Sequence, residues 1–296
     1  MTPSAVPVDR QPQRIGGTVL GVHVDRTGWD ELLTTIWRWA RVGQSRVVCC
    51  CNAHSVVAAR HDRGVRAALA AADRVTPDGM PVAWMLRRLG HAGQQRVDGP
   101  DLMWRLCGLA ARAGLPIFLY GNRPATLSRL EARLRRAFPD LVVAGTLAPP
   151  FAPALEAVAL TGDVAFAASR DAERTMVERI NHSGARLVFV SLGCPKQELW
   201  MARQRGAVRA VMVGVGAAFD FHAGTLRRAP AWMRACGLEW LHRLACEPRR
   251  LWRRYASTNS RFLAGALVQL TTRWRARRRG KALAEVGAGA GDALIE

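Results

Sequence analysis

The sequence predicts a layered α/β domain with a largely parallel sheet, followed by a basic helical C-terminal appendage. Short apolar runs alternate with helical patterns along most of the chain, which is typical of parallel sheets covered by helices. Several runs, such as 46–51, are apolar throughout, as expected for strands buried on both faces. After Asp220 the composition turns to arginine and tryptophan, which predicts the appendage.

The predicted strands and helices follow one another in a regular order. We expect strands over 18–24, 46–51, 74–77, 116–120, 141–144, 187–192 and 208–215. We expect helices over 29–42, 53–72, 80–89, 100–113, 125–138, 172–181 and 197–205. This order predicts a Rossmann-like domain over residues 15–220, preceded by a disordered segment over 1–14.

Residues that directly follow the strands are candidate site residues, because ligands of parallel sheets bind at the carboxyl ends of strands. They are Asn52, Asp78, Gly121, Asn122, Gly193 with Lys196 and Gln197, and Gly216. Asp78, in Thr-Pro-Asp-Gly, is either a turn residue or a carboxylate placed to accept a proton. In the next loop Arg96 could hold an anion, whereas Asp98 and Asp101 also suit helix capping.

The net charge of +20 is concentrated near the C-terminus. Residues 222–281 contain fifteen Lys and Arg against two acids, which indicates a polyanionic partner: nucleic acid, an anionic membrane surface or a phosphorylated substrate. In the appendage, 221–261, clustered guanidinium groups suit phosphate oxygens. A solvated basic helix would explain these arginines but not the accompanying Trp232, Trp240 and Trp252.

Residues 262–296 form a basic tail. Small apolar residues alternate with arginines over 262–279, which predicts a helix at an anionic membrane interface, and we expect disorder over 287–296. The sequence contains no run of eighteen apolar residues, so we expect no membrane-spanning helix. The N-terminus has no apolar signal-peptide core.

Signatures of metals and cofactors are missing from the sequence. Its seven cysteines include the consecutive Cys49, Cys50 and Cys51, which suit neither a disulfide framework nor a zinc site and indicate a reducing compartment. Gly214-Val-Gly lacks the third glycine of a dinucleotide fingerprint, and there is no P-loop. Without an Asp-x-Asp pair, we predict no metal and no cofactor, so arginines and helix ends would meet leaving-group charge.

Several short motifs follow one another along the chain, and their combination in this order identifies a protein family more specifically than any single motif does. They are Thr76-Pro-Asp-Gly-Met-Pro-Val, Gln95-Arg-Val-Asp-Gly-Pro-Asp-Leu-Met, Ala148-Pro-Pro-Phe, Gly193-Cys-Pro-Lys-Gln-Glu, Gly214-Val-Gly-Ala-Ala-Phe-Asp-Phe, Arg228-Ala-Pro and Gly237-Leu-Glu-Trp-Leu-His-Arg-Leu-Ala-Cys-Glu-Pro-Arg-Arg. With these motifs the chain resembles the WecG/TagA/CpsF glycosyltransferases over roughly residues 16–262.

The resemblance implies an inverting, metal-independent transfer of an N-acetylmannosamine-type or related hexose from a UDP-sugar to a polyprenyl-diphosphate-linked sugar. This reaction would take place in the cytoplasm at the inner face of the cell membrane, in the synthesis of cell-surface polysaccharides. The family's proposed base falls on Asp78, and its substrate-binding positions fall on Asn52, Arg96, Gln197, Arg243, Arg250 and Arg253. The three appendage arginines would share one face of a continuous helix and close over the diphosphate.

Asp101, Gly121 and Asn122 complete the expected substrate-binding set, from the Arg96 loop and a strand end. Cys50 departs from the family, which commonly has threonine there, and this puts a hydroxyl contact in doubt.

Two other classes of function remain open, a nucleic-acid-binding module and a non-catalytic membrane scaffold. The first would explain the charge but not the sheet-edge residues, so we expect no nucleic-acid partner. The second is kept open by Cys50. The expected partners are a UDP-sugar donor, a polyprenyl-diphosphate-linked acceptor and an anionic membrane surface, and assembly into a homo-oligomer is compatible with the sequence.

Overall fold

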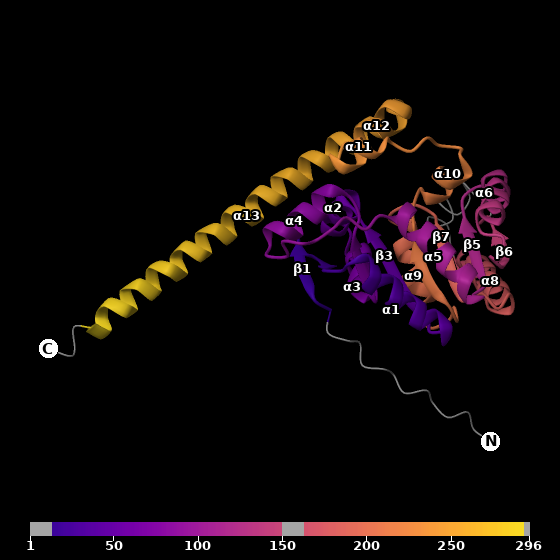
Figure 1. Cartoon of the computed structure of the whole chain (residues 1–296), viewed down its shortest axis with the longest axis horizontal. Helices are drawn as coiled ribbons and strands as arrows, with labels where there is room; N and C mark the ends of the chain where they lie inside the picture. Colours follow the sequence, from indigo (N-terminus) through magenta and orange to yellow (C-terminus); the bar gives the residue numbers. More distant parts are fainter. Residues whose placement is uncertain (1–13, 150–162, 293–296) are drawn as a thin grey trace, which may run out of the picture.

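A computed structural model describes residues 14–149 and 163–292 and contains a six-stranded sheet (Figure 1). Its strand order is β4-β3-β8-β7-β5-β6, and every neighbouring pair is parallel. The strands are β3 (Arg46–Cys51), β4 (Arg74–Pro77), β5 (Ile117–Gly121), β6 (Val143–Leu147), β7 (Leu187–Ser191) and β8 (Val211–Gly214). The predicted α/β fold with a parallel sheet is therefore confirmed.

Helices cover both faces of this sheet, because successive strand residues point to opposite sides. Cys49 and Cys51 of β3 lie in one core cluster, whereas Val48 and Cys50 lie in the other. The first cluster includes residues of α2 (Ala53–His61), α3 (Arg63–Ala71), α4 (Met80–Arg88), α8 (Asp163–His182) and α9 (Lys196–Gln204). The second includes residues of α1 (Trp29–Arg41), α5 (Gly99–Ala113), α6 (Pro124–Ala137) and α10 (Ala218–Ala223).

The N-terminal third differs from the prediction in two places. The single helix expected over 53–72 is two helices, because Asp62 interrupts it and its side chain accepts hydrogen bonds from the N–H groups of Gly64 and Val65 at the start of α3. The strand expected over 18–24 is a hairpin of β1 (Gly16–Val19) and β2 (Val22–Asp25). Its two turn residues, Leu20 and Gly21, have positive φ angles, which a pattern of apolar residues does not reveal.

The N-terminal segment expected to be disordered lies outside the described residues except for Arg14. Its guanidinium group donates hydrogen bonds to the buried Asp25 carboxylate, with both N–O distances 2.8 Å. The ordered domain thus begins at least one residue before position 15.

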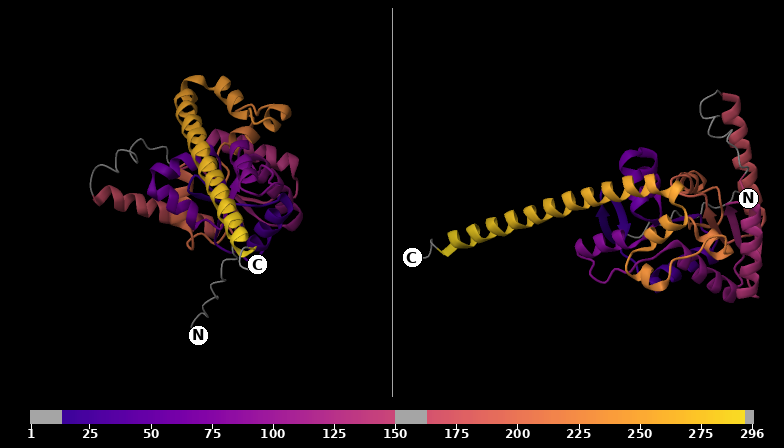
Figure 2. Two further views of the ribbon diagram at one scale, coloured as in Figure 1. Left: turned by 90° about the vertical axis from the view of Figure 1, so that its left-hand side faces the viewer. Right: turned by 90° about the horizontal axis from the view of Figure 1, so that it is seen from above.

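The appendage predicted over 221–261 and the tail that follows it consist of two short helices and one long one, and together they are called the appendage from here on. They are α11 (Ala231–Ala235), α12 (Glu239–Cys246) and α13 (Pro248–Asp292), the last beginning with a proline, as is common at a first helical position. The helix α13 continues through position 262, and the stretch from Gly287, which was expected to be disordered, is helical as far as Asp292. Figure 2 shows the first part of α13 against the domain and the rest projecting beyond it.

One face of α13 packs against the α/β domain. Leu251, Phe262 and Ala266 are at most 4 % exposed. Gly265 lies so close to Leu20 that a Cβ atom there would be 2.5 Å from the leucine side chain. Other residues of the same helix are exposed to solvent, including Leu263, Leu267 and Val268. This part of the predicted tail helix therefore has one side on the domain and another side free.

Two polar side chains of α13 also bond to backbone groups of the domain. The Gln269 amide donates to the carbonyl of Thr18 (2.6 Å) and accepts from the N–H of Leu20 (2.9 Å), which ties the helix to the β1–β2 hairpin. Arg273 donates to the carbonyl of Leu89 at 2.9 Å. In the described part of the chain, no helix is both long and apolar enough to span a bilayer.

Replacement of the docked Phe262 by alanine should lower the free energy of unfolding by about 3 kcal/mol, because it leaves a cavity under α13. Leu263, the next residue of the same helix, is 67 % exposed, so Leu263→Ala is the matched control and should cost less than about 0.5 kcal/mol. Urea unfolding of both full-length variants measures the difference. Equal losses would contradict the docking of this helix.

Candidate active site

A cavity of about 600 Å³ lies at the carboxyl ends of the parallel strands, between the α/β domain and the appendage. Its floor comes from the strand ends and the loops that follow them, including Asn52, Asp78, Asn122, Gly193 and Gly216. Its roof comes from α12 and α13, including Trp240, Arg243, Arg250, Leu251, Arg254 and Tyr255. The convergence of the strand-end residues, expected from the sequence, is thus confirmed.

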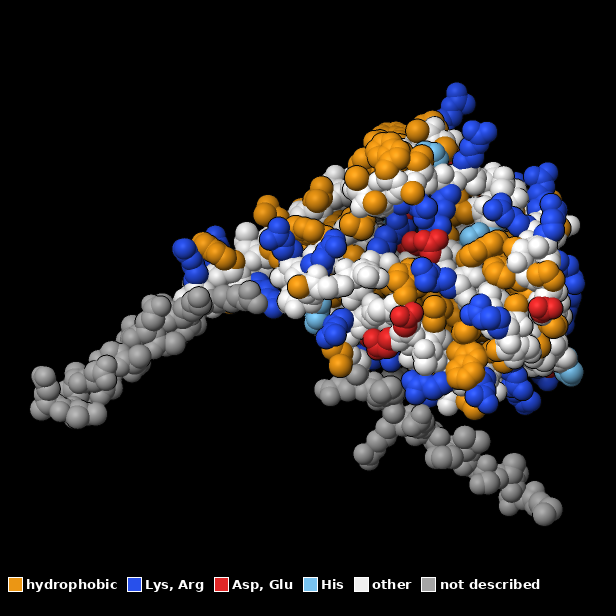
Figure 3. All heavy atoms as spheres, in the orientation of Figure 1, with side chains coloured by type: hydrophobic (Ala, Val, Ile, Leu, Met, Phe, Trp, Pro, Cys, Tyr) orange, Lys and Arg blue, Asp and Glu red, His pale blue; other side chains and the backbone are white. Residues whose placement is uncertain are grey.

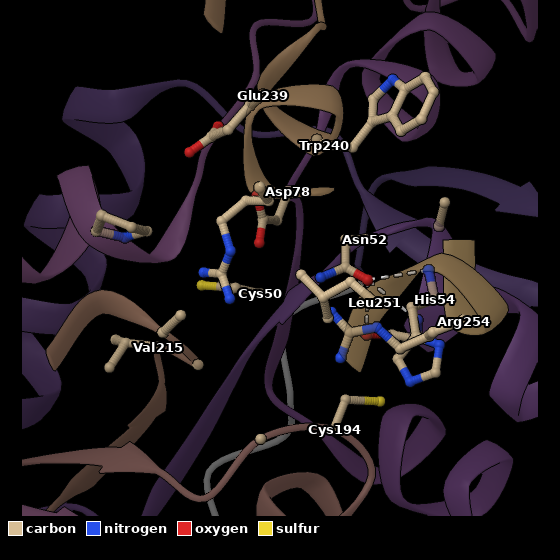
Figure 4. Close-up of a pocket in the computed structure, with 18 of the residues that line it drawn as sticks. Cys50, Asn52, His54, Asp78, Cys194, Val215, Glu239, Trp240, Leu251 and Arg254 are labelled. Carbon is tan, nitrogen blue, oxygen red and sulfur yellow. Dashed lines mark hydrogen bonds between the residues drawn. The ribbon is translucent and has the colours of Figure 1, made fainter. Parts of the chain in front are cut away.

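Asn52 ends β3 and caps α2. Its side-chain oxygen accepts hydrogen bonds from the N–H groups of His54 (3.0 Å) and Ser55 (3.2 Å). The amide nitrogen points away from these bonds, on the far side of the side chain from His54 (Figure 4). The cap therefore fixes the side chain and leaves its donor group available to a ligand.

Gly121 and Asn122 at the end of β5 play different parts. Gly121 is buried with φ at 115°, and a Cβ atom there would lie 2.4 Å from the Ser191 carbonyl oxygen, so the position requires glycine for close strand packing. Asn122 also has a positive φ and lines the cavity, with its side-chain oxygen accepting from the N–H of Arg123. Only Asn122 of this pair is placed to touch a ligand with its side chain.

Asp78 follows β4 and lines the cavity, with its side chain 19 % exposed. Burial raises the pKa of this carboxyl to about 7. The Arg96 guanidinium, 3.8 Å away, opposes that rise, whereas the negative charges of Asp98 and Glu239 add to it. A carboxylate that titrates near neutral pH is suited to accept a proton in a reaction.

Arg96 and Arg228 form a network of ion pairs beside Asp78. Arg96 contacts Glu239 at 2.5 Å and Asp98 at 3.6 Å. Arg228 contacts Asp98 at 2.7 Å and also pairs with Asp101. Arg96 and Asp98 of the domain and Arg228 and Glu239 of the appendage therefore neutralise one another's charges beside Asp78. The position of the Arg96 guanidinium group is fixed by the carboxylates of Glu239 and Asp98.

Asp101 is not among the residues that line the cavity, and its carboxylate belongs to the ion-pair network around Arg228. It pairs with Arg228 and, at 3.5 Å, with Arg234, and these contacts lower the pKa of its carboxyl against the effect of burial. The expectation that Asp101 binds substrate is therefore not supported by its position. It holds the linker between the domain and α11 instead.

Gln197 lines the cavity but uses its amide inside the protein. The side chain is 3 % exposed, accepts from the N–H of Gly216 at 3.1 Å and donates to Glu198 at 3.0 Å. Glu198 is itself buried, and burial raises the pKa of its carboxyl. Gln197 thus joins the loops after β7 and β8, a contact between distant segments that sequence spacing does not show.

The arginines of the appendage are placed differently from the prediction. Arg243 lies on α12 and Arg250 on α13, so no continuous helix joins them, and both contact Glu247 between the two helices (3.1 and 2.8 Å). Arg254, four residues after Arg250, also lines the cavity.

Arg253, predicted to bind the diphosphate, is exposed outside the cavity lining, 5.3 Å above the ring of its neighbour Trp252. The sequence signal for the helix break is Pro248, at which α13 begins, but the choice between Arg253 and Arg254 depends on how α13 packs on the domain.

A family model for the WecG/TagA/CpsF glycosyl transferases matches residues 17–276. The chain belongs to the WecG/TagA/CpsF family. It is therefore a glycosyltransferase, of the kind that acts in cell-surface polysaccharide synthesis, and not a non-catalytic scaffold. The match extends beyond position 262, where the resemblance seen in the sequence was expected to end, and covers the part of α13 that is docked on the domain.

The cavity of this glycosyltransferase has two electrically different ends. Asp78 and Glu239 lie at one end, and His54 and Arg254 lie at the other (Figure 4). Burial and the positive charge of Arg254 lower the pKa of His54, whose ring nitrogen lies 3.3 Å from the Thr258 hydroxyl. Within the described ranges, no cluster of His, Cys, Asp and Glu side chains is arranged to hold a metal ion.

Replacement of Asp78 by asparagine should stabilise the glycosyltransferase at alkaline pH. Because burial raises the pKa of Asp78 to about 7, the folded protein binds a proton that the unfolded chain releases near pH 4. The wild type should therefore lose stability relative to Asp78→Asn as the pH rises from about 4 to 7. Above pH 7 the difference should stay constant, on the order of a few kcal/mol.

Urea unfolding at pH 5, 7 and 9 tests this dependence, with the exposed change Asp140→Asn as the control. A wild type that is more stable than Asp78→Asn at pH 9 would show instead that Arg96 stabilises the ionised carboxylate.

Proposed function

We propose that this glycosyltransferase moves an N-acetylmannosamine-type or related hexose from a UDP-sugar to a polyprenyl-diphosphate-linked sugar, with inversion and without a metal ion. The observation that carries the proposal is the polarity of the cavity. A carboxyl with a pKa near 7 lies at one end and Arg254 at the other (Figure 4), and Arg243 and Arg250 also line the cavity. This arrangement suits a base acting on an acceptor hydroxyl opposite a diphosphate leaving group.

In the proposed reaction, Asp78 accepts the proton of the acceptor hydroxyl while the hydroxyl oxygen attacks the anomeric carbon. The bond between that carbon and the UDP oxygen breaks, and UDP leaves with the bonding electron pair. Attack from the face opposite the leaving group inverts the anomeric centre, and it needs a single carboxylate base. The arginines neutralise the charge that develops on the diphosphate, which is the role a metal ion would otherwise have.

The proposed acceptor lies in a membrane, and the outer surface of the appendage suits contact with an anionic bilayer. Trp232, Leu241 and Trp252 are between 44 and 62 % exposed around the cavity roof, and Leu267 and Trp274 continue the exposed apolar surface along α13. Figure 3 shows hydrophobic side chains gathered where α11 and α12 meet α13, with Lys and Arg side chains beside them. Exposed indoles next to arginines are typical of interfacial helices.

Purified protein should transfer sugar from a UDP-hexose to a short-chain prenyl-diphosphate-linked acceptor in the presence of excess EDTA. A panel of UDP-sugars, followed by mass spectrometry of the lipid product, identifies the donor. Asp78→Asn keeps the shape of the side chain but removes the base, so it should lower kcat by a factor of about 100 or more. Activity lost in EDTA and restored by Mg²⁺ or Mn²⁺ would contradict a metal-independent reaction.

Arg254→Ala should lower kcat/KM far more than Arg253→Ala when the assay is run in detergent with a short-chain acceptor. Arg254 lines the cavity, and loss of one donor to a developing negative charge costs about 3 kcal/mol, or roughly 100-fold in rate. Arg253 is the neighbouring arginine outside the cavity lining and should change the rate less than twofold. Equal effects of the two variants would mean that the arginines act only through adsorption to a membrane or micelle.

A further inference from the structure

Arg96 is shared unequally among three carboxylates. Its guanidinium group lies 2.5 Å from Glu239, 3.6 Å from Asp98 and 3.8 Å from Asp78. Arginine and a carboxylate in direct contact form hydrogen bonds of about 2.7–2.9 Å, often two at once. Only Glu239 has such a contact with Arg96, so Asp78 has an arginine beside it without being locked to it.

The residue that engages Arg96 comes from the appendage. Glu239 is the first residue of α12, a fully described helix that has no buried residue. Arg228, in the segment before α11, lies 3.8 Å from Glu239 and bonds to Asp98 in the domain. Ion pairs that cross between domain and appendage therefore set the position of α12 next to Asp78.

We propose that Glu239 is a positioning residue for the catalytic base: it draws Arg96 away from Asp78 and so keeps that carboxylate free to accept a proton. This inference rests on the proposed function of Asp78 as the base, and it assigns Glu239 of the appendage an influence on the basicity of Asp78. When α12 is seated, Glu239 competes for the guanidinium group. When Glu239 is missing, Arg96 is free to close the gap to Asp78 and form a direct salt bridge.

The charges that face Asp78 come from three further segments. Arg96 and Asp98 lie in the loop before α5, Glu239 on α12 and Arg228 before α11; on β3, burial keeps the thiol of Cys50 protonated. Both arginines lower the pKa of Asp78, and both carboxylates raise it. Loss of Glu239 removes a negative charge and also lets Arg96 approach, so both consequences make Asp78 a weaker base.

The pKa of Asp78 determines how well this carboxylate accepts a proton from the acceptor hydroxyl in the proposed reaction. A carboxylate in a close salt bridge with arginine has a pKa lowered by about 1–3 units. Such a group is ionised at neutral pH but accepts a proton poorly, because general bases work best with a pKa near the working pH. Glu239 thus couples the seating of the appendage over the cavity to the strength of the base beneath it.

Glu239→Gln tests this role because it keeps the size of the side chain and removes its charge. The acidic limb of the pH profile of kcat/KM should lie about one pH unit lower than in the wild type, while the rate on the alkaline plateau falls about tenfold. Arg96→Gln should move the limb in the opposite direction. Glu131→Gln, on α6 where Glu131 pairs with Arg135, is the matched control and should leave the profile unchanged.

A ¹³C-detected NMR titration of the aspartate carboxyls, with Asp78 assigned through Asp78→Asn, measures the same change without turnover. A lower titration midpoint for Asp78 in Glu239→Gln supports the proposal. A midpoint that is unchanged or higher would overturn it, even if activity falls, because Glu239 would then be only a structural contact. Failure of the proposed function is distinct: it appears as no transfer by the wild type, or as an acidic limb that persists in Asp78→Asn.

Discussion

The active-site cavity depends on the seating of α13 on the α/β domain. Phe262 and Ala266 bury one face of the helix, and Gln269 bonds to the backbone of the β1–β2 hairpin. These contacts lie more than two turns beyond Arg254, and they fix which side of the helix faces the strand ends. If α13 were not docked, the carboxyl edge of the sheet would keep Asn52 and Asp78 but would lose Arg250 and Arg254 of that helix.

Docking of the appendage is hydrophobic at one end and ionic at the other. Along α13 the contact is made by buried apolar side chains, whereas α11 and α12 have no buried residue and are held near Asp78 by Arg228 and Glu239. Because the ion-paired side chains are at most 19 % exposed, salt screens these pairs less than it would screen pairs on the surface.

The same ion pairs resolve a conflict in the site. A cavity that receives a diphosphate needs positive charge, and a general base is weakened by positive charge close to it. In the proposed reaction these two requirements are separated in space, because Arg254 lies at one end of the cavity and carboxylates surround Arg96 at the other. Burial then raises the pKa of Asp78 toward neutral pH despite the neighbouring guanidinium groups.

The sequence by itself determined the fold class, the family and the set of residues at the sheet edge. Apolar runs that end in Asn or Asp fix this edge locally, because parallel strands must bring their carboxyl ends to one side. Asn52, Asp78 and Asn122 could thus be placed from the sequence alone, whereas the break between α12 and α13 at Pro248 was missed in favour of one continuous helix. Whether each of these residues binds substrate is a separate, chemical question.

Only the tertiary structure decided which polar groups are free and which are used internally. Asp101 and Gln197 were predicted to bind substrate from their motifs; in the structure Asp101 pairs with Arg228, and Gln197 lines the cavity while it accepts a hydrogen bond from the backbone of Gly216. Arg254 rather than Arg253 lines the cavity, because long-range packing fixes the rotation of α13 about its axis. Glu239 meets Arg96 across 143 residues, and no local pattern encodes a contact between side chains so far apart in the chain.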